Sequence, residues 1–475
     1  MIKKKILILF AVSLLFSGCS NEDYEELNRD PNYPTQVSAE QLFTSATKSL
    51  FDQIESTNVN QNVFRLFAQY WTETTYVDEA NYDLTNRRIP ENHWSELYRD
   101  VLFDLADAKT IATANGNENS TKEGQISILE VYAWQILVDT FGDVPYNEAL
   151  KGKEIKSPKY DNAATIYTDL IARLNNALSM LGTGENLGDS DIIYKSDVNK
   201  WKKFGNSLKL KLGARLTDVN LALATTTITE AVNAGVFTSS DDDAKISYEG
   251  STPNTNPIWI ALVQSGRNDF IPANTITDHM NTLNDPRRPM YFKQNLGVGV
   301  YTGGIYGKQS SFSSHTHIGE LLHDPTYKGV LLDYVEVKFN LAEAVEQGIA
   351  VGGTAKEHYT DAINTSMTDW GVSATDAATY LASTTVDYDT AAGTWKEKIG
   401  MQYWLAMYNR GFEGWYVYRK FDAPTFNTAF GSGFPVPKRY TYPTNEQSLN
   451  EANWETASTA IGGDEQQSKI FWDVN

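Results

Sequence analysis

Two clusters of side chains have residue types and spacing that could bind a metal ion. His315, His317 and His323 stand on one polar stretch, and a His-x-His pair can ligate zinc. Three consecutive aspartates at 241–243 could offer oxygen ligands to calcium, but the spacing and the glycine of an EF-hand loop are missing. We therefore expect a polar loop and a solvated turn at these positions, with no bound metal or cofactor.

Carboxylates and glycine-rich turns could also support catalysis. Asp78 and Glu79 are neighbours, but glycoside hydrolysis needs two carboxyl groups about 5 to 9 Å apart in space. With 60 Asp and Glu residues in the chain, such pairs arise by chance. The stretch "YTGGIYGKQ" fails as a phosphate-binding loop because Thr302 stands where that motif needs glycine. The GxSxG and HExxH motifs are absent, so we predict that the protein is not an enzyme.

The single cysteine, Cys19, occupies a position where its thiol could be modified. Three lysines at 3–5 precede an apolar run from Ile6 to Phe16, and two small residues separate that run from the cysteine. This is the layout of a secretory signal peptide, and the run is too short for a membrane-spanning helix. The end of the run, "LFSGC", resembles a bacterial lipobox, in which the cysteine becomes the acylated first residue. The alternatives are a plain cleavable signal with a chance cysteine, or a buried thiol in a retained helix.

Composition limits the possible partners and the number of domains. The formal net charge of the 475-residue chain is −20, and the absence of a long basic block argues against nucleic acid as a partner. Residues 1–18 are the predicted signal peptide, and 19–38 are predicted to form an acidic tether after the lipidated cysteine. No Pro- or Ser-rich linker divides the remainder, so we expect residues 39–475 to form a single domain.

Hydrophobic periodicity predicts that most long segments are helices. The expected helices cover 124–137, 162–181, 198–219, 331–348 and 355–371. Asp161 could cap the second, and the third has an apolar stripe with its basic residues on the opposite face. The last two are joined by the turn "IAVGGT" and have small residues suited to the close packing of tetratricopeptide-like hairpins, although the 34-residue period is matched only loosely.

Two long irregular stretches, 72–93 and 293–323, are rich in Gly, Asn, Ser and Tyr. Loops of this length in a compact protein are usually functional or disordered. A sugar has one face of C–H groups and an equator of hydroxyls, which suits aromatic rings flanked by carboxylates, amides and guanidinium groups. The candidate ligand contacts are Trp71, Tyr76, Asp78, Tyr82, Asn86, Arg87, Arg88, Tyr301, Tyr306 and His315. Alternatively, these rings only pack the loops against the helices.

Seven stretches of the chain are characteristic when taken together: "FGDVPYNEAL" (141–150), "WKKFGNSLKLKLGARL" (201–216), "NDPRRPMYF" (284–292), "EVKFNLAEAVEQG" (336–348), "YTDAINTSMTDWGV" (359–372), "QYWLAMYNRGFEGWYVYRKFDAP" (402–424) and "PKRYTYPTNE" (437–446). In this order they resemble the SusD/RagB family, the outer-membrane nutrient-binding lipoproteins of Bacteroidetes, and most closely its SusD-like branch. We interpret the matches at Asp285-Pro286-Arg287 and at 404–419 as structural, with Trp415, Tyr416 and Tyr418 packing core helices.

The resemblance implies a mainly α fold, a scaffold of tetratricopeptide-like helical hairpins with long irregular loops and little β structure. It implies non-catalytic capture of an oligosaccharide and delivery to a SusC-like TonB-dependent transporter. The acids at 22–26 resemble the export signal of surface lipoproteins, so the expected location is the outer membrane, lipid-anchored through Cys19 and facing the exterior. The alternatives are a peptide-binding member of the family and a secreted glycoside hydrolase.

Overall fold

The computed structural model of this protein describes residues 37–114 and 116–474. The predicted signal peptide (1–18), Cys19 and the tether up to residue 36 lie outside the described residues. Residues 39–475 form one compact unit. In the part of the chain that is described, no helix is both long and apolar enough to span a bilayer.

Helices make up most of this unit. They are α3 (Ala39–Glu55), α4 (Phe64–Phe67), α5 (Ile89–Ser95), α6 (Phe103–Thr113), α7 (Ser120–Phe141), α8 (Ala163–Met180), α9 (Val198–Leu216), α10 (Leu221–Ala234), α11 (Pro257–Trp259), α12 (Asn274–Thr282), α13 (Arg288–Tyr291), α14 (Tyr334–Glu346), α15 (Ala355–Asp369), α16 (Ala374–Leu381), α17 (Trp395–Ala406), α18 (Gly411–Phe421), α19 (Glu446–Leu449) and α20 (Glu451–Ala460). Short 3-10 and π helices are η1 (Glu79–Asn81), η2 (Glu96–Leu102), η3 (Gly116–Asn119), η4 (Gly188–Ser190), η5 (Ser240–Asp242), η6 (Ile260–Gln264), η7 (Phe312–Ser314) and η8 (Glu320–His323). The predicted mainly α fold with little β structure is confirmed, and each of the five predicted helices is present.

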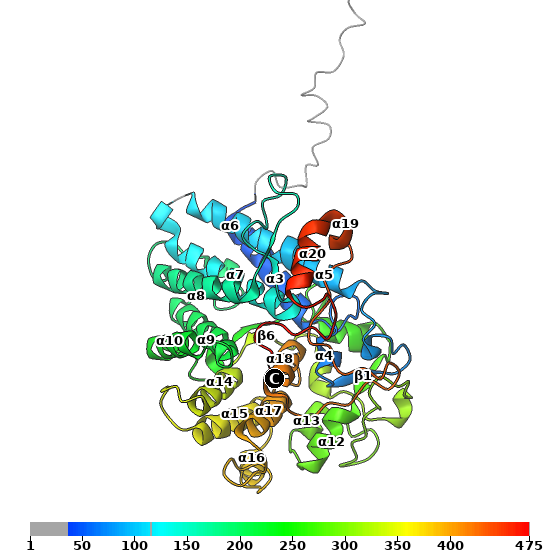
Figure 1. The fold of residues 1–475 in the computed structure, drawn as a ribbon. Helices are drawn as coiled ribbons and strands as arrows, with labels where there is room; N and C mark the ends of the chain where they lie inside the picture. Colours follow the sequence, from blue (N-terminus) through cyan, green and yellow to red (C-terminus); the bar gives the residue numbers. More distant parts are fainter. Residues whose placement is uncertain (1–36, 115, 475) are drawn as a thin grey trace, which may run out of the picture. The chain divides into compact units, whose positions relative to one another are not determined.

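Consecutive helices pack against each other as hairpins, in the pairs α7–α8, α9–α10, α14–α15 and α17–α18. The first three pairs follow one another down one side of the unit (Figure 1). Helix α7 is buried along almost its whole length, which places it at the centre of the packing. The structure therefore has the expected scaffold of helical hairpins.

Helix starts are set by side-chain caps. Thr354 and Glu357 form a reciprocal capping box at the start of α15. At α8 the predicted cap was wrong by one residue, because Asn162 accepts the hydrogen bonds of the first turn. The carboxylate of Asp161 instead accepts a hydrogen bond from the backbone N–H of Asn147 at 2.8 Å. It therefore holds the turn that follows α7.

Helix α9 is buried on both faces, and the buried residues include the basic Lys209, Lys211 and Arg215. Lys211 Nζ lies 3.1 Å from Glu336 Oε1 of α14. Arg215 Nε donates to Asp139 of α7 at 2.6 Å, and its Nη2 donates to Glu413 of α18 at 3.1 Å. Burial alone raises the pKa of Glu413, but nearby Lys211, Arg215 and Arg410 outweigh it and lower that pKa to about 2. Four helices are thus joined through paired, desolvated charges.

The strands form three two-stranded antiparallel sheets. They are β1 (Trp71–Glu73) with β5 (Phe270–Pro272), β2 (Val144–Pro145) with β3 (Tyr160–Asp161), and β4 (Ala244–Ile246) with β6 (Gly329–Leu332). In the first sheet Trp71 pairs with Pro272, and Glu73 pairs with Phe270. This short pairing brings the polar segment after β1 next to the segment before β5, nearly two hundred residues away in sequence.

The Asp-Pro-Arg motif is structural, as interpreted from the sequence. Asp285 and Arg287 are fully buried, and Arg287 Nη2 donates to Asp285 Oδ2 at 2.6 Å. The same guanidinium donates to Ser366 of α15 at 3.1 Å and to Gln402 of α17 at 3.3 Å. The motif therefore fixes the segment after α12 to two scaffold helices.

The aromatic residues of α18 also pack inside. Trp415 and Tyr416 are fully buried, and the Trp415 indole donates to the Pro437 carbonyl at 2.8 Å. Tyr418 is half-buried and stacks on Phe426 with ring centroids 4.2 Å apart. The structural interpretation of this motif agrees with their burial.

Two Arg–Asp pairs with the same two-residue spacing allow a controlled test of the buried motif. We expect Arg287→Ala to lower the free energy of unfolding by about 3–5 kcal/mol, because it leaves the Asp285 charge buried without a partner. Arg267→Ala removes the partner of Asp269 from an exposed pair and should cost less than about 1 kcal/mol. Urea unfolding of both variants measures the difference, and equal losses would contradict a structural role for the motif.

Candidate functional site

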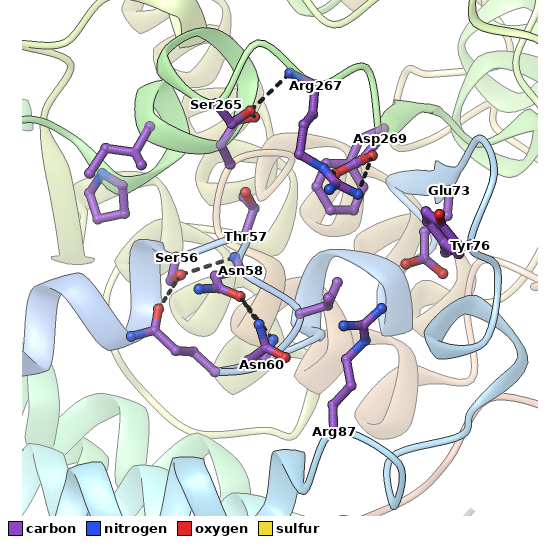
Figure 2. A pocket seen from close by; sticks show the side chains of 16 residues that line it. Ser56, Thr57, Asn58, Asn60, Glu73, Tyr76, Arg87, Ser265, Arg267 and Asp269 are labelled. Carbon is purple, nitrogen blue, oxygen red and sulfur yellow. Dashed lines mark hydrogen bonds and ion pairs between the residues drawn. The ribbon is translucent and has the colours of Figure 1, made fainter.

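A pocket of about 430 Å³ opens beside the β1–β5 pair. Its lining comes from the loop after α3, from β1 and the loop after it, and from the segment that runs from α11 to β5. Figure 2 shows these three segments around one hollow, with Arg87 and Arg267 entering from opposite sides. The antiparallel pairing of Glu73 with Phe270 holds the two sides together.

The loop at 56–61 forms a polar rim and is shaped by its own side chains. Ser56 Oγ donates to Gln61 Oε1 at 2.6 Å and accepts from the Asn58 backbone N–H at 3.1 Å. Asn58 Oδ1 accepts from the backbone and side-chain amides of Asn60 at 3.0 and 2.8 Å. Both asparagines are exposed, so part of their amide capacity remains free for the hydroxyls of a ligand.

The opposite rim carries a guanidinium held in a fixed orientation. Arg267 Nε and Nη2 donate to the Asp269 carboxylate at 2.5 and 3.1 Å, in a bidentate pair. Asp269 is itself anchored, because its carbonyl accepts from the Thr74 backbone N–H at 2.9 Å. The pair offers donors to a ligand without a net charge.

One wall of the pocket is apolar and one ring stands at its edge. The apolar lining consists of Val59, Pro257, Ile260, Ala261 and Phe270. Tyr76 also lines the pocket and is 60% exposed, so a ring face is available to a ligand. A pocket with an apolar wall, a free ring and a rim of amides matches the two kinds of surface that a sugar presents.

Buried carboxyl groups lie at the inner end of the pocket. Glu73 lines the pocket and Arg87 pairs with Glu79, which lies just beneath. Burial, together with the neighbouring Glu79 carboxyl, raises the pKa of Glu73 to about 9. Burial therefore favours the neutral form of the Glu73 carboxyl.

Of the ten predicted contact residues, the structure brings Tyr76 and Arg87 together at the pocket. Asp78, Asn86 and Arg88 come from the same loop and are exposed, but they lie outside its lining. Arg88 lies 3.8 Å from a carboxylate oxygen of Glu91, and Asn86 donates to Asp83.

Four of the predicted aromatic contacts are buried, which corrects their assignment to the ligand surface. The exposed fraction of Trp71 is 1%, and its indole donates to the Tyr408 hydroxyl at 3.1 Å. Tyr306 donates to the Leu66 carbonyl at 2.8 Å, and Tyr82 is buried next to it. Tyr301 is buried too, with the Arg288 guanidinium 5.5 Å from its ring centroid. For these rings the packing alternative describes the structure.

The loop at 293–323 does not reach the pocket lining. Half-buried His315 is bonded within this loop, Nδ1 lying 2.8 Å from the Ser311 carbonyl. His317 Nε2 and His323 Nδ1 likewise contact backbone carbonyls, at 3.0 and 2.9 Å. Among the described residues no group of three His, Cys, Asp or Glu side chains is arranged to hold a metal ion.

Sequence reasoning missed the residues at 56–61 and 265–269. Their signal was present, since "STNVNQ" and "SGRND" are polar runs that follow apolar helical segments. What the sequence did not reveal was that β1 and β5 pair and place both runs beside Tyr76.

A second pocket of about 460 Å³ lies near β6 and α14 and has a different chemistry. Its lining includes four aspartates, two lysines and Arg410. Asp333 and Arg410 pair at 3.0 Å, and Asp243 pairs with Lys245 at 3.3 Å. Of the rings in its lining, Trp370 is buried and Tyr327 is half-buried, whereas Tyr76 in the first pocket is exposed. The pocket beside β1 is therefore the better candidate for a sugar.

Solved structures share this fold over nearly the whole chain. A chitin-binding SusD homologue from Flavobacterium johnsoniae is 26% identical, with a TM-score of 0.79 over 91% of this chain and 99% of its own. A chitin-binding protein at 24% identity gives 0.80 over 92% and 100%. A SusD homologue from Bacteroides uniformis at 23% gives 0.78 over 93% and 100%. Because their sequence identities are below 25%, the last two similarities show only that the fold is shared.

Among curated protein sequences none matches this chain significantly. The profile of the SusD-like family, described as starch-binding and associating with the outer membrane, matches residues 31–443. That range covers the hairpin scaffold, the Asp-Pro-Arg motif and every segment that lines the pocket. The chain therefore belongs to the SusD-like family of outer-membrane-associated starch-binding proteins.

Proposed function

We propose that this protein captures an oligosaccharide in the pocket beside β1, without catalysis, and passes it to a SusC-like TonB-dependent transporter. The observation that carries the proposal is the combination of the exposed Tyr76 ring, the apolar wall and the amide rim in one hollow. The chitin-binding SusD homologue at 26% identity makes chito-oligosaccharides the first ligands to test.

The carboxyl groups around the pocket support binding over hydrolysis. Glycosidases need two carboxyls about 5 to 9 Å apart, both able to reach the substrate. Glu73 lines the pocket, but Glu79 is buried outside that lining and is engaged by Arg87. Asp269 is engaged by Arg267. Asp78, the other half of the pair considered from the sequence, is exposed outside the lining.

A lipid anchor completes the proposal. Cys19, acylated after removal of residues 1–18, would tether the domain at 39–475 to the outer membrane through the acidic segment. Each buried methylene contributes about 0.8 kcal/mol, and several acyl chains give a stable anchor. The acids at 22–26 favour display on the outer face, where a transporter could receive the ligand.

The ring at the pocket edge gives the most direct test of ligand binding. We expect Tyr76→Ala to weaken binding of a chito-oligosaccharide about tenfold, because stacking and burial on one ring contribute about 1–2 kcal/mol. Phe434→Ala removes a ring of similar exposure (62%) outside the pocket and should leave the affinity unchanged. Isothermal calorimetry measures both.

Equal affinities for Tyr76→Ala and the wild type would contradict this site. Oligopeptides in the same titration address the alternative ligand class, and peptide binding without sugar binding would overturn the glycan proposal. Reducing ends released from the oligosaccharides by the wild type would favour a hydrolase.

The anchor has its own test. Cys19→Ala should abolish incorporation of labelled palmitate and move the protein from the membrane to the soluble fraction, because the thiol is the acylation site. Ser20→Ala alters the next residue and should keep the label. Label that still enters Cys19→Ala would refute the anchor.

A further inference from the structure

Two buried carboxyl groups lie side by side at the inner end of the pocket. Glu73 ends β1, and Glu79 begins η1 after a loop that turns the chain back on itself. Both residues are buried, and the Glu73 carboxyl contacts the backbone N–H of Ala80, the residue that follows Glu79. Two carboxylates this close in a desolvated place repel each other strongly if both are ionised.

The hydrogen bonds that the two carboxyl groups make with other residues leave one buried carboxylate oxygen without a donor. Glu73 Oε2 accepts from the Ala80 backbone N–H at 2.9 Å, and Glu79 Oε1 accepts from Arg87 Nε. Glu79 Oε2 is buried and has no hydrogen-bond partner among the described residues. A proton on Glu73 would supply the missing donor, because a protonated carboxyl donates one O–H.

The charged groups around the pair are few. From η1 comes Glu79, and from the turn that follows comes Arg87, whose charge lowers the pKa of Glu73. Across the strand pair, Asp269 is already neutralised by Arg267. The neighbouring phenol, Tyr306, is buried and stays protonated, since burial raises its pKa. These surroundings, with burial as the largest cause, raise the pKa of Glu73 to about 9.

We propose that Glu73 and Glu79 share a single proton, so that the pocket has no net charge and selects uncharged oligosaccharides over uronic or sulfated ones. One negative charge on the pair balances Arg87, and Asp269 balances Arg267. An anionic sugar would have to compete with a carboxylate for either guanidinium. The choice of ligand class rests on the proposed function, whereas the shared proton does not.

Electrophoretic mobility at pH 7 tests the shared proton without a ligand. Glu73→Gln replaces a carboxyl that already holds a proton, so this variant should keep the charge of the wild type. The control is Glu455→Gln, at an exposed position on α20, which should remove one negative charge. Capillary electrophoresis in which Glu73→Gln shifts as far as the control would overturn the proposal.

Unfolding provides a second readout on the same variants. In the folded protein the pKa of Glu73 is about 9, above its ordinary value of 4.5. Between these two pH values the folded protein therefore binds one more proton than the unfolded protein. Stability is then lost as the pH rises through this window. The logarithm of the unfolding constant of the wild type, relative to Glu73→Gln, should rise by about one per pH unit between pH 5.5 and 8.5. Parallel pH profiles would contradict the shared proton.

Calorimetry with a neutral chito-oligosaccharide and an acidic oligogalacturonide tests the ligand class. The neutral sugar should bind at least tenfold more tightly, and Asp269→Asn, which frees Arg267, should narrow that preference. Equal binding of both sugars by the wild type would overturn the selectivity. If neither sugar binds while the mobilities agree with expectation, the glycan function fails and the shared proton stands.

Discussion

Paired charges buried between helices are the constraint under which this fold is built. Arg215 contacts Asp139 and Glu413, and Lys211 contacts Glu336, so α7, α9, α14 and α18 have to meet in one arrangement. Removing such charges from water costs several kcal/mol each, which only good geometry can offset. An alternative packing of the same hairpins would leave a charge unpaired. The network therefore favours this one packing of the hairpins.

The network reaches the pocket through a short chain of contacts. Arg410 donates to Glu336 at 2.6 Å, and the preceding carbonyl, of Asn409, accepts from Arg65 Nη2 at 2.6 Å. Arg65 Nη1 also donates to the carbonyl of Glu55, the last residue of α3, at 2.9 Å. The polar rim at 56–61 begins directly after Glu55. A rim fixed in this way presents its amides to a ligand without a large ordering cost.

The helices were predictable because their apolar residues repeat at helical spacing, and the family resemblance supplied their arrangement. Tyr76 and Arg87 were found from the composition of their loop. Trp71 was misassigned because its burial depends on the pairing of β1 with β5, a contact between distant segments that no local pattern encodes. The burial of Lys211 and Arg215 likewise depends on contacts with distant segments. The polar runs at 56–61 and 265–269 were overlooked because the sequence does not reveal that β1 pairs with β5.

Hydrogen–deuterium exchange with and without a saturating chito-oligosaccharide would locate ligand binding on the intact domain. Binding in the pocket beside β1 should slow exchange at 56–61, 73–87 and 265–270 together, since these three segments line one hollow. Exchange in the second pocket, at 324–333 and 406–410, should stay unchanged. Protection confined to the second pocket would contradict the assignment of the site.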